Sequence, residues 1–345
     1  MTEPIRLIDQ SGKPTTDEAA LPSSEELLSG YRELVLARRL NTQATALAKQ
    51  GKLVAYPSSL GQEACQVAAA TVLEDGDWLF PTYRDAAAIV ARGVEPGEVM
   101  ALFRGDRHCG YDPAVTHVAP QAAPLATQLP HAVGVGHAAR SRGESTVVMA
   151  LCGDGATSEG DFHEALNFAA VLAAPVVFLV QNNKYAISTP VHRQTAASSL
   201  AAKGPGYGMR SVLVDGNDFA ALTVVLEKAV RTARDGGGPT LVEADTYRLH
   251  PHTNSDDPTR YRDDDEVEQW LPRDPLLRLR EYLLTTGALT ERHEGEFAAD
   301  AEDLAAGVRS ATAAPTDIDE LFANVYATRT PQLVEQAATL RSVQA

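Results

Sequence analysis

Short apolar runs alternate with longer helical patterns in the middle of the chain. The runs are rich in Val, Leu, Ala and Phe, and they cover residues 146–151, 174–180, 211–216 and 239–247. Short β-rich segments separated by helices are typical of a parallel sheet, because parallel neighbours need long crossover connections. The pattern therefore predicts an α/β protein with a single parallel sheet and helices on both faces, and this sheet should carry the functional residues.

Helical periodicity dominates on both sides of this region. A serine cap precedes a long amphipathic pattern that starts at Ser24, and Gly51 is its stop signal. Two shorter helices are predicted over residues 61–72 and 85–92, joined by the loop DGDWLFPTYRD. From Pro275 onward the pattern is helical to the end of the sequence.

The same patterns divide the chain into three zones. Residues 1–24 are polar, rich in Pro, Ser and Thr and without periodicity, so we expect a flexible N-terminal arm. Residues 25–275 are predicted to form the α/β domain together with its N-terminal helices. Residues 276–345 are predicted to form a helical C-terminal extension.

Charge and hydropathy exclude two classes of partner. The 345 residues carry 30 basic and 46 acidic side chains, a formal net charge of −16, which repels phosphate backbones and argues against nucleic-acid binding. The longest apolar stretch, Leu166 to Val180, is interrupted by Asn167 and Pro175 and is shorter than the roughly 20 residues that span a membrane. We expect neither nucleic acid nor membrane as a partner.

The ends and the cysteines bear on the compartment. The N-terminal residues lack the apolar core of a signal peptide and carry Asp and Glu, which argues against export. The three cysteines, Cys65, Cys109 and Cys152, form no CxxC pair, so neither a disulfide framework nor a thiolate zinc site is indicated. A reducing cytoplasmic location is the expectation.

One segment carries the candidate chemistry, GDGATSEGDFHEALNFAAVLAAPVVFLVQNNKYAIS. Gly153 and Gly155 flank Asp154 where one predicted strand ends, and Asn183 stands 29 residues further on (183 − 154), where the next strand ends. Right-handed crossovers bring both strand ends to one edge of the sheet, with neighbouring strands roughly 4.8 Å apart. An acid and an amide there, with a carbonyl from the region of Tyr185, suit Mg²⁺ that also holds a diphosphate.

Other interpretations of this segment are weaker. No GK[ST] follows the glycines, which disfavours a Walker nucleotide site, and no GxGxxG follows a first strand, which disfavours a dinucleotide site. The remaining alternative is that these residues only form turns and helix caps.

At these residues the chain resembles a known family. GDG followed by NN resembles the thiamin-diphosphate fingerprint, and the whole segment is similar to the alpha chain of the decarboxylating component of 2-oxo-acid dehydrogenase complexes. LGQEA, FPTYRD, PLATQLPHAVG, GPGYG, VDGND, PTLVEADTYR and PHTNSDDPTRYR extend the resemblance over about residues 25–345. These motifs are most similar to those of the branched-chain type.

The resemblance implies a set of site residues. It implies magnesium bound by the carboxylate of Asp154, the amide of Asn183 and the carbonyl of Tyr185, and His252 as the active-site histidine. Gly153, Gly155 and Ala156 would line the diphosphate. Tyr83 and Arg84 would reach it from the helical zone, Leu125 would support the bent cofactor, and Gln181 stands where many relatives place arginine.

Two further features follow from the resemblance. PLATQ resembles a potassium loop, with the Pro124 carbonyl, Thr127 and Gln128 as ligands; the alternative is that Thr127 and Gln128 are helix-start residues. A pairing of Arg248 with Asp256 would order the loop that carries His252. No role is transferred to the histidines of the shortened segment from residue 106 to 120.

The chain is predicted to need partners. Thiamin-diphosphate catalysis also requires a carboxylate from a second α/β domain, and the flanking zones read as helical. The resemblance implies a beta subunit that supplies this glutamate in a heterotetramer of two alpha and two beta subunits, and a lipoyl-bearing acyltransferase core that accepts the acyl group.

The resulting functional prediction is decarboxylation of a branched-chain 2-oxo acid with reductive acylation of lipoyl groups. A pyruvate or acetoin dehydrogenase is the alternative within the family, because one or two methylenes discriminate by only about 1–3 kcal/mol. The alternative from another class is a non-catalytic subunit that only binds the cofactor.

Overall fold

The computed structural model describes residues 3–105, 109–313, 318–323 and 325–344. At its centre lies a five-stranded sheet in the order β1-β2-β3-β7-β6, in which every neighbouring pair is parallel. Its strands are β1 Trp78–Phe80, β2 Val148–Gly153, β3 Val176–Asn182, β6 Arg210–Asp215 and β7 Thr240–Asp245. The predicted parallel α/β sheet is confirmed.

One strand was not predicted. The sequence places Trp78–Phe80 in a loop, whereas the structure pairs it with β2 at the edge of the sheet, Trp78 opposite Val148. Three residues are too few to show a strand pattern, so only the tertiary pairing reveals this strand. A separate antiparallel pair, β4 Tyr185–Ala186 and β5 Thr189–Pro190, follows β3.

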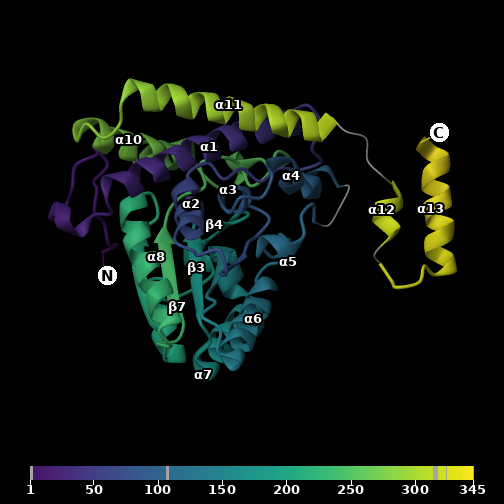
Figure 1. Cartoon of the computed structure of the whole chain (residues 1–345), viewed down its shortest axis with the longest axis horizontal. Helices are drawn as coiled ribbons and strands as arrows, with labels where there is room; N and C mark the ends of the chain where they lie inside the picture. The colour runs from purple at the N-terminus through teal and green to yellow at the C-terminus, as the bar shows by residue number, and fades with distance from the viewer. Residues whose placement is uncertain (1–2, 106–108, 314–317, 324, 345) are drawn as a thin grey trace.

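Helices cover both faces of the sheet, and Figure 1 shows them on either side of it. The helices are α1 Ser24–Lys49, α2 Glu63–Thr71, α3 Ala86–Ala91, α4 Pro96–Arg104, α5 Pro113–Thr116, α6 Gln128–Arg142, α7 Gly160–Leu172, α8 Phe219–Arg234, α9 Asp264–Trp270, α10 Pro275–Thr285, α11 Glu291–Ala313, α12 Ile318–Ala323 and α13 Pro331–Gln344.

Alternate strand residues point to two separate cores. Leu151 and Leu179 pack with residues of α1, α2 and α8, whereas their neighbours Ala150 and Phe178 pack with residues of α6 and α7. This alternation is the period-2 geometry of a strand, and because both sides are covered the strands read as continuous apolar runs.

The long N-terminal helix begins as the sequence predicts. Ser23 and Glu26 form a capping box, in which the Ser23 hydroxyl accepts from the Glu26 amide and the Glu26 carboxylate accepts from the Ser23 amide. Gly51, with φ of 72°, ends the turn after α1.

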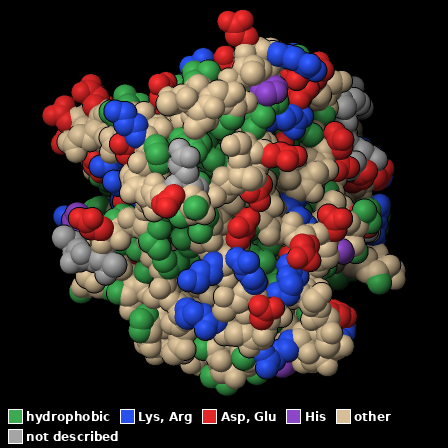
Figure 2. Space-filling view, turned by 60° about the vertical axis from the view of Figure 1, so that its left-hand side comes forward, with side chains coloured by type: hydrophobic (Ala, Val, Ile, Leu, Met, Phe, Trp, Pro, Cys, Tyr) green, Lys and Arg blue, Asp and Glu red, His purple; other side chains and the backbone are tan. Residues whose placement is uncertain are grey.

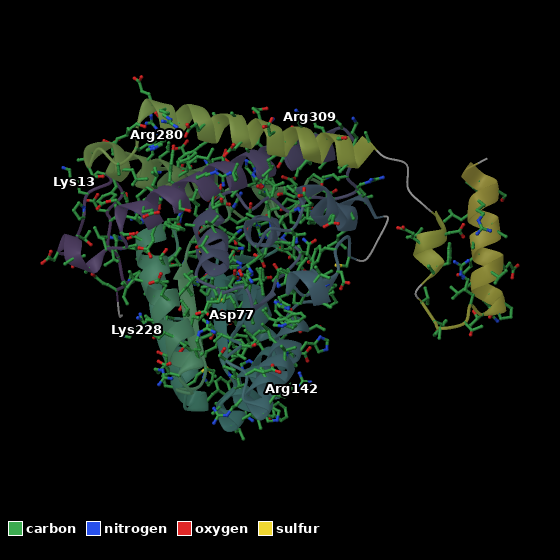
Figure 3. The ribbon with its side chains drawn as sticks, in the orientation of Figure 1. Lys13, Asp77, Arg142, Lys228, Arg280 and Arg309 are labelled. Carbon is green, nitrogen blue, oxygen red and sulfur yellow. The ribbon has the colours of Figure 1, made fainter. Side chains whose placement is uncertain are left out.

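Charged side chains fasten the outer helices to this framework (Figure 3). Asp77 is buried at the start of β1, where its carboxylate accepts from both Nη atoms of Arg234 of α8 and from the Val147 amide. On the other side, Arg309 of α11 donates to Gln43 of α1 at 2.8 Å.

The N-terminal segment differs from the loose arm that its composition predicts. Ile5 forms a parallel bridge to Val214, next to β6, and Asp218 accepts hydrogen bonds from the amides of Leu7 and Ile8. The side chain of Ile8 is 1% exposed. The edge strand and a buried carboxylate thus hold a segment that has no periodicity of its own.

The three domain boundaries stay predictions.

The C-terminal helices confirm the helical pattern from Pro275 onward. In Figure 1, α11 runs across α1, while α12 and α13 lie beside each other away from the sheet. Within the described residues, none of the helices combines the length and apolar character needed to cross a bilayer. In the face shown in Figure 2, acidic and basic side chains are interspersed among exposed hydrophobic ones.

Candidate functional site

The carboxyl ends of β2 and β3 open into one cavity. Gly153 at the end of β2 is in register with Gln181 of β3, so Asp154 and Asn183 emerge at the same edge. The cavity has a volume of about 380 Å³. It is lined by Gln62, Thr82, Tyr83, Arg84, Ala123, Leu125, Gly153, Asp154, Gly155, Ala156, Gln181, Asn183, Tyr185, Ala186, Ile187 and His252.

Every residue that the sequence predicted for thiamin diphosphate lines this cavity. They come from the loop after β1, the segment before α6, the ends of β2 and β3, strand β4 and the loop after β7. The tertiary structure therefore brings the predicted set to one place, while the ligand that each contacts remains a prediction.

Three oxygen atoms face one another in the cavity wall. One terminal atom of the Asn183 amide lies 3.1 Å from Oδ1 of Asp154 and 3.2 Å from the carbonyl oxygen of Tyr185; this atom is Oδ1 in one orientation of the amide and Nδ2 in the exchanged one, and the three-oxygen cluster is the first of these. All three are acceptors when Asp154 is ionised, so no hydrogen lies between them. About 3 Å is also the separation of adjacent oxygen ligands in an octahedron with 2.0–2.1 Å metal bonds. This arrangement has the composition and spacing of a hard-cation site.

A cation bound here would have one carboxylate ligand, and its other protein ligands would be neutral amide and carbonyl oxygens. The part of the chain that the structure describes contains no group of three or more His, Cys, Asp and Glu side chains able to hold a metal ion. An amide, a carbonyl and one carboxylate match the ligands of Mg²⁺, which usually completes its shell with water and phosphate oxygens.

The carboxylate of this cluster is buried and held from behind. Asp154 is 1% exposed, and burial raises the pKa of its carboxyl. Its Oδ2 accepts from Nε2 of Gln194 at 2.8 Å, which leaves Oδ1 directed at Asn183. Gln194 was missed by sequence reasoning, because nothing in the linear order links it to a residue 40 positions earlier.

The two glycines of the GDG turn have different roles. A Cβ on Gly155 would lie 2.8 Å from the Cβ of Ala186, so the close approach of β4 requires glycine there. A Cβ on Gly153 would meet no atom within 4 Å and would project into open space at the cavity. Gly153 therefore leaves room that a ligand can occupy.

His252 is fixed as a neutral hydrogen-bond donor. Nη2 of Arg84 lies 3.0 Å from its Nδ1, and Nη1 of Arg248 lies 3.4 Å from the same atom. A guanidinium only donates, so Nδ1 accepts and the ring hydrogen resides on Nε2. Burial, followed by the charges of Arg84 and Arg248, lowers the pKa of His252 to about 4. At neutral pH this environment favours hydrogen bonding by Nε2 over donation of a proton from a charged imidazole.

The loop that carries His252 is ordered differently from the expected Arg248–Asp256 pair. Nη2 of Arg248 donates to the hydroxyl of Tyr261, and that hydroxyl donates to Oδ2 of Asp256. The same Oδ2 accepts from the His252 amide at 2.8 Å. A direct pairing was wrong because Tyr261 stands between the two charged groups and relays the contact.

Gln181 occupies the position where many relatives have arginine. Its Nε2 donates to Oδ1 of Asp85 at 2.7 Å, and burial raises the pKa of this Asp85 carboxyl. The cavity wall thus has an uncharged amide here. Arg84, whose Nη1 also donates to the Ser58 carbonyl at 2.9 Å, is held at the wall in a fixed orientation.

The predicted potassium residues lie beside the cavity and are absent from its lining. Thr127 caps α6 without a side-chain cap bond, and Nε2 of Gln128 donates to the Leu151 carbonyl at 2.7 Å. Oε1 of Gln128 is buried and has no hydrogen-bond partner among the described residues. The shortened segment over residues 106–120 has two histidines to which the sequence analysis gave no role. His108 lies outside the described residues, and Nδ1 of His117 contacts the Asp75 carbonyl.

Together, the fold and the site define a class of protein. It is a parallel α/β protein with an oxygen-lined cavity at the carboxyl edge of its sheet, where ligands of such folds bind. A polar cluster suited to a hard cation, an open glycine position and a fixed imidazole occupy the same cavity.

The chain belongs to the family of dehydrogenase E1 components, because the model of this family matches residues 31–317. It is 47% identical over 345 residues to the 3-methyl-2-oxobutanoate dehydrogenase subunit alpha of Mycobacterium tuberculosis, covering 99% of this chain and 94% of the relative. It is 38% identical over 335 residues to the pyruvate dehydrogenase E1 component subunit alpha of Acholeplasma laidlawii, covering 95% and 96%. The protein of the same name from Staphylococcus aureus is 38% identical over 314 residues, covering 90% and 84%. The family is thiamin-diphosphate dependent.

Proposed function

We propose that this chain is the alpha subunit of a branched-chain 2-oxo-acid dehydrogenase. The identity of 47% to a 3-methyl-2-oxobutanoate dehydrogenase subunit alpha exceeds the 38% to the pyruvate dehydrogenase subunits and supports this substrate class. Pyruvate remains the second candidate, because those relatives also match 90% or more of the chain.

The observation that carries the catalytic proposal is the oxygen cluster of Asp154, Asn183 and Tyr185. Its 3.1–3.2 Å spacings suit Mg²⁺, which would tie the diphosphate of the cofactor to the sheet edge. Gly153 leaves room for the diphosphate, and Arg84 supplies a buried positive charge at the same wall. When bound, thiamin diphosphate supplies the nucleophilic carbon and the electron sink for decarboxylation.

The chain's own residues would then position the substrate and polarise its reacting oxygen. Nε2 of His252, held protonated by the Arg84 contact at Nδ1, donates a hydrogen bond to an oxygen that gains negative charge in the reaction. Leu125 lines the cavity with Ala186 and Ile187 and would exclude water from one side. A subunit that only binds the cofactor would not need a histidine whose tautomer is fixed in this way.

The proposal includes a beta subunit and an acyltransferase. The described chain contains one parallel sheet, so the glutamate that activates the cofactor would come from a beta subunit, in a heterotetramer of two alpha and two beta chains. Leu125 and Ile187 are 41% and 53% exposed at the cavity, and a covering subunit would bury them. A lipoyl-bearing acyltransferase would accept the acyl group, and the complex would work in the cytoplasm.

Potassium is proposed as a second cation. The buried Oε1 of Gln128, without a partner in the described structure, is an oxygen that a cation would satisfy, together with Thr127 and the carbonyl of Pro124. Its role would be to stabilise the segment that presents Leu125.

The test is an assay of the chain assembled with its beta subunit. We expect reduction of a dye electron acceptor with thiamin diphosphate, Mg²⁺ and the 2-oxo acids derived from Val, Leu and Ile, and lower kcat/KM with pyruvate. A higher kcat/KM with pyruvate would make pyruvate the preferred substrate in place of the branched-chain acids. No reduction with any 2-oxo acid would overturn the catalytic proposal. Calorimetric titration with thiamin diphosphate, with and without Mg²⁺, tests binding separately.

A further inference from the structure

Gln62 lies directly behind the oxygen cluster and is not explained by the proposed function. It is the residue before α2, it is 1% exposed, and it lines the cavity. Its Oε1 accepts from Nδ2 of Asn183 at 3.0 Å. Its own Nε2 is buried and has no hydrogen-bond partner within the described chain. Such an unpaired donor is costly, so the arrangement needs a reason.

The amide of Asn183 has two possible orientations in the same space. With Nδ2 on Gln62, Oδ1 accepts a long hydrogen bond from the Tyr185 amide at 3.4 Å and faces the oxygens of Asp154 and Tyr185. A cation among these three oxygens would offset their mutual repulsion. With oxygen and nitrogen exchanged, Nδ2 donates to both of those oxygens at 3.1 and 3.2 Å, and Oδ1 faces Gln62. In this second orientation the Gln62 amide can turn so that Nε2 donates to Oδ1 of Asn183, and its unpaired donor is satisfied.

The two orientations differ in their fitness for a cation. Only the first presents an oxygen of Asn183 to the cluster. An acceptor at position 62 holds Nδ2 in that orientation at 3.0 Å, and the longer contact from the Tyr185 amide to Oδ1 adds to it. The second fills the cluster with an N–H donor and excludes a cation.

We propose that Gln62 is a positioning residue for the cation site, which sets the orientation of the Asn183 amide. Its oxygen holds Asn183 in the cation-binding orientation, and its nitrogen holds Asn183 in the other one. The two amides turn together when the cation binds. The inference rests on the proposed function in that the cation is the Mg²⁺ of the cofactor site, and it adds a residue that acts on the cation through Asn183.

The experiment measures Mg²⁺ affinity in the assembled complex. At fixed thiamin diphosphate, the Mg²⁺ concentration for half-maximal cofactor binding is determined by calorimetry or intrinsic fluorescence. Gln62→Met keeps the volume and removes both hydrogen-bonding groups, and we expect an affinity about tenfold weaker, as for other residues that orient metal ligands. The exposed Gln10→Glu variant is the control and should match the wild type.

A double-mutant cycle separates orientation from a general structural effect. In an Asn183→Asp background the carboxylate has two equivalent oxygens, so orientation no longer matters and Gln62→Met should change Mg²⁺ affinity less than twofold. An equal loss in both backgrounds would show that Gln62 only supports packing and would overturn the inference.

A second variant covers the case in which Asn183→Asp binds no cofactor. Gln62→Glu still accepts from Nδ2 of Asn183, so its Mg²⁺ affinity should equal or exceed that of the wild type; a loss as large as that of Gln62→Met would refute the proposed role. If the wild-type complex itself shows no Mg²⁺-dependent binding of thiamin diphosphate, the proposed function fails instead.

Discussion

Nη2 of Arg84 lies 3.0 Å from Nδ1 of His252, so one permanently charged side chain sets both the tautomer and the pKa of the imidazole. The charged groups around this ring are Arg84 and Arg248, which lower its pKa, and Asp256, which raises it. Burial is the largest cause of the shift to about 4.

Arg84→Met should raise the pKa of His252 towards its ordinary value near 6.5, because it removes the closer of the two positive charges. The ring C–H signal of His252, assigned by its loss in His252→Gln, can be titrated by NMR. Lys13→Met, on the N-terminal segment (Figure 3), is the charge-matched control and should leave the titration unchanged. An unaltered pKa in Arg84→Met would contradict this account.

The depressed pKa of His252 also predicts how stability depends on pH. Between about pH 4 and 6.5 an unfolded imidazole binds a proton that the folded one does not, so the free energy of unfolding falls as pH is lowered through this window. His252→Gln should remove this part of the slope. Urea unfolding at pH 4.5 and 7.5 measures it, and an identical difference in both proteins would exclude His252 as its source.

The two glycines of the GDG turn should respond differently to substitution by alanine. Gly155→Ala places a Cβ 2.8 Å from Ala186 and should lower the free energy of unfolding by about 1–3 kcal/mol. Gly153→Ala meets no protein atom within 4 Å, so stability should change little while thiamin diphosphate binds more weakly. Thermal unfolding and calorimetry distinguish the two; normal cofactor affinity in Gly153→Ala would place the diphosphate elsewhere.

Asp154→Asn should separate stability from function. Burial already raises the pKa of this carboxyl, and an asparagine amide can donate to the neighbouring oxygens that a cation would otherwise bridge. We expect the metal-free variant to gain up to about 1 kcal/mol in free energy of unfolding and to lose Mg²⁺-dependent binding of thiamin diphosphate. Denaturant unfolding in EDTA and calorimetric titration give both quantities. A clear loss of stability would mean that the carboxylate serves the fold.

Tyr261→Phe should loosen the loop after β7 without disturbing the sheet. It removes the hydroxyl that connects Arg248 to Asp256, and leaves a buried guanidinium with one partner fewer. A loss of about 1–2 kcal/mol is expected, with faster proteolysis near residues 252–262. Phe322→Leu on α12 is a control that lies outside this loop. Unchanged proteolysis would show that the loop is held by other contacts.

The sequence by itself determined the parallel sheet, the long capped helix and the family, because these depend on local periodicity and on motifs that are contiguous in the chain. It also placed Asp154 and Asn183 at one edge, since strand order and crossover handedness suffice for that inference. The alternation of buried side chains and the positions of strand ends are both visible in the linear order of residues.

Only the tertiary structure decided contacts between distant segments. Gln62 and Gln194 reach the oxygen cluster from other parts of the chain, Tyr261 replaces the direct pairing of Arg248 with Asp256, and the N-terminal segment packs beside β6. These features depend on where side chains meet in space, which no spacing or periodicity in the sequence encodes. The protonation of His252 belongs to the same group, because it follows from burial and from charges contributed by two separate loops.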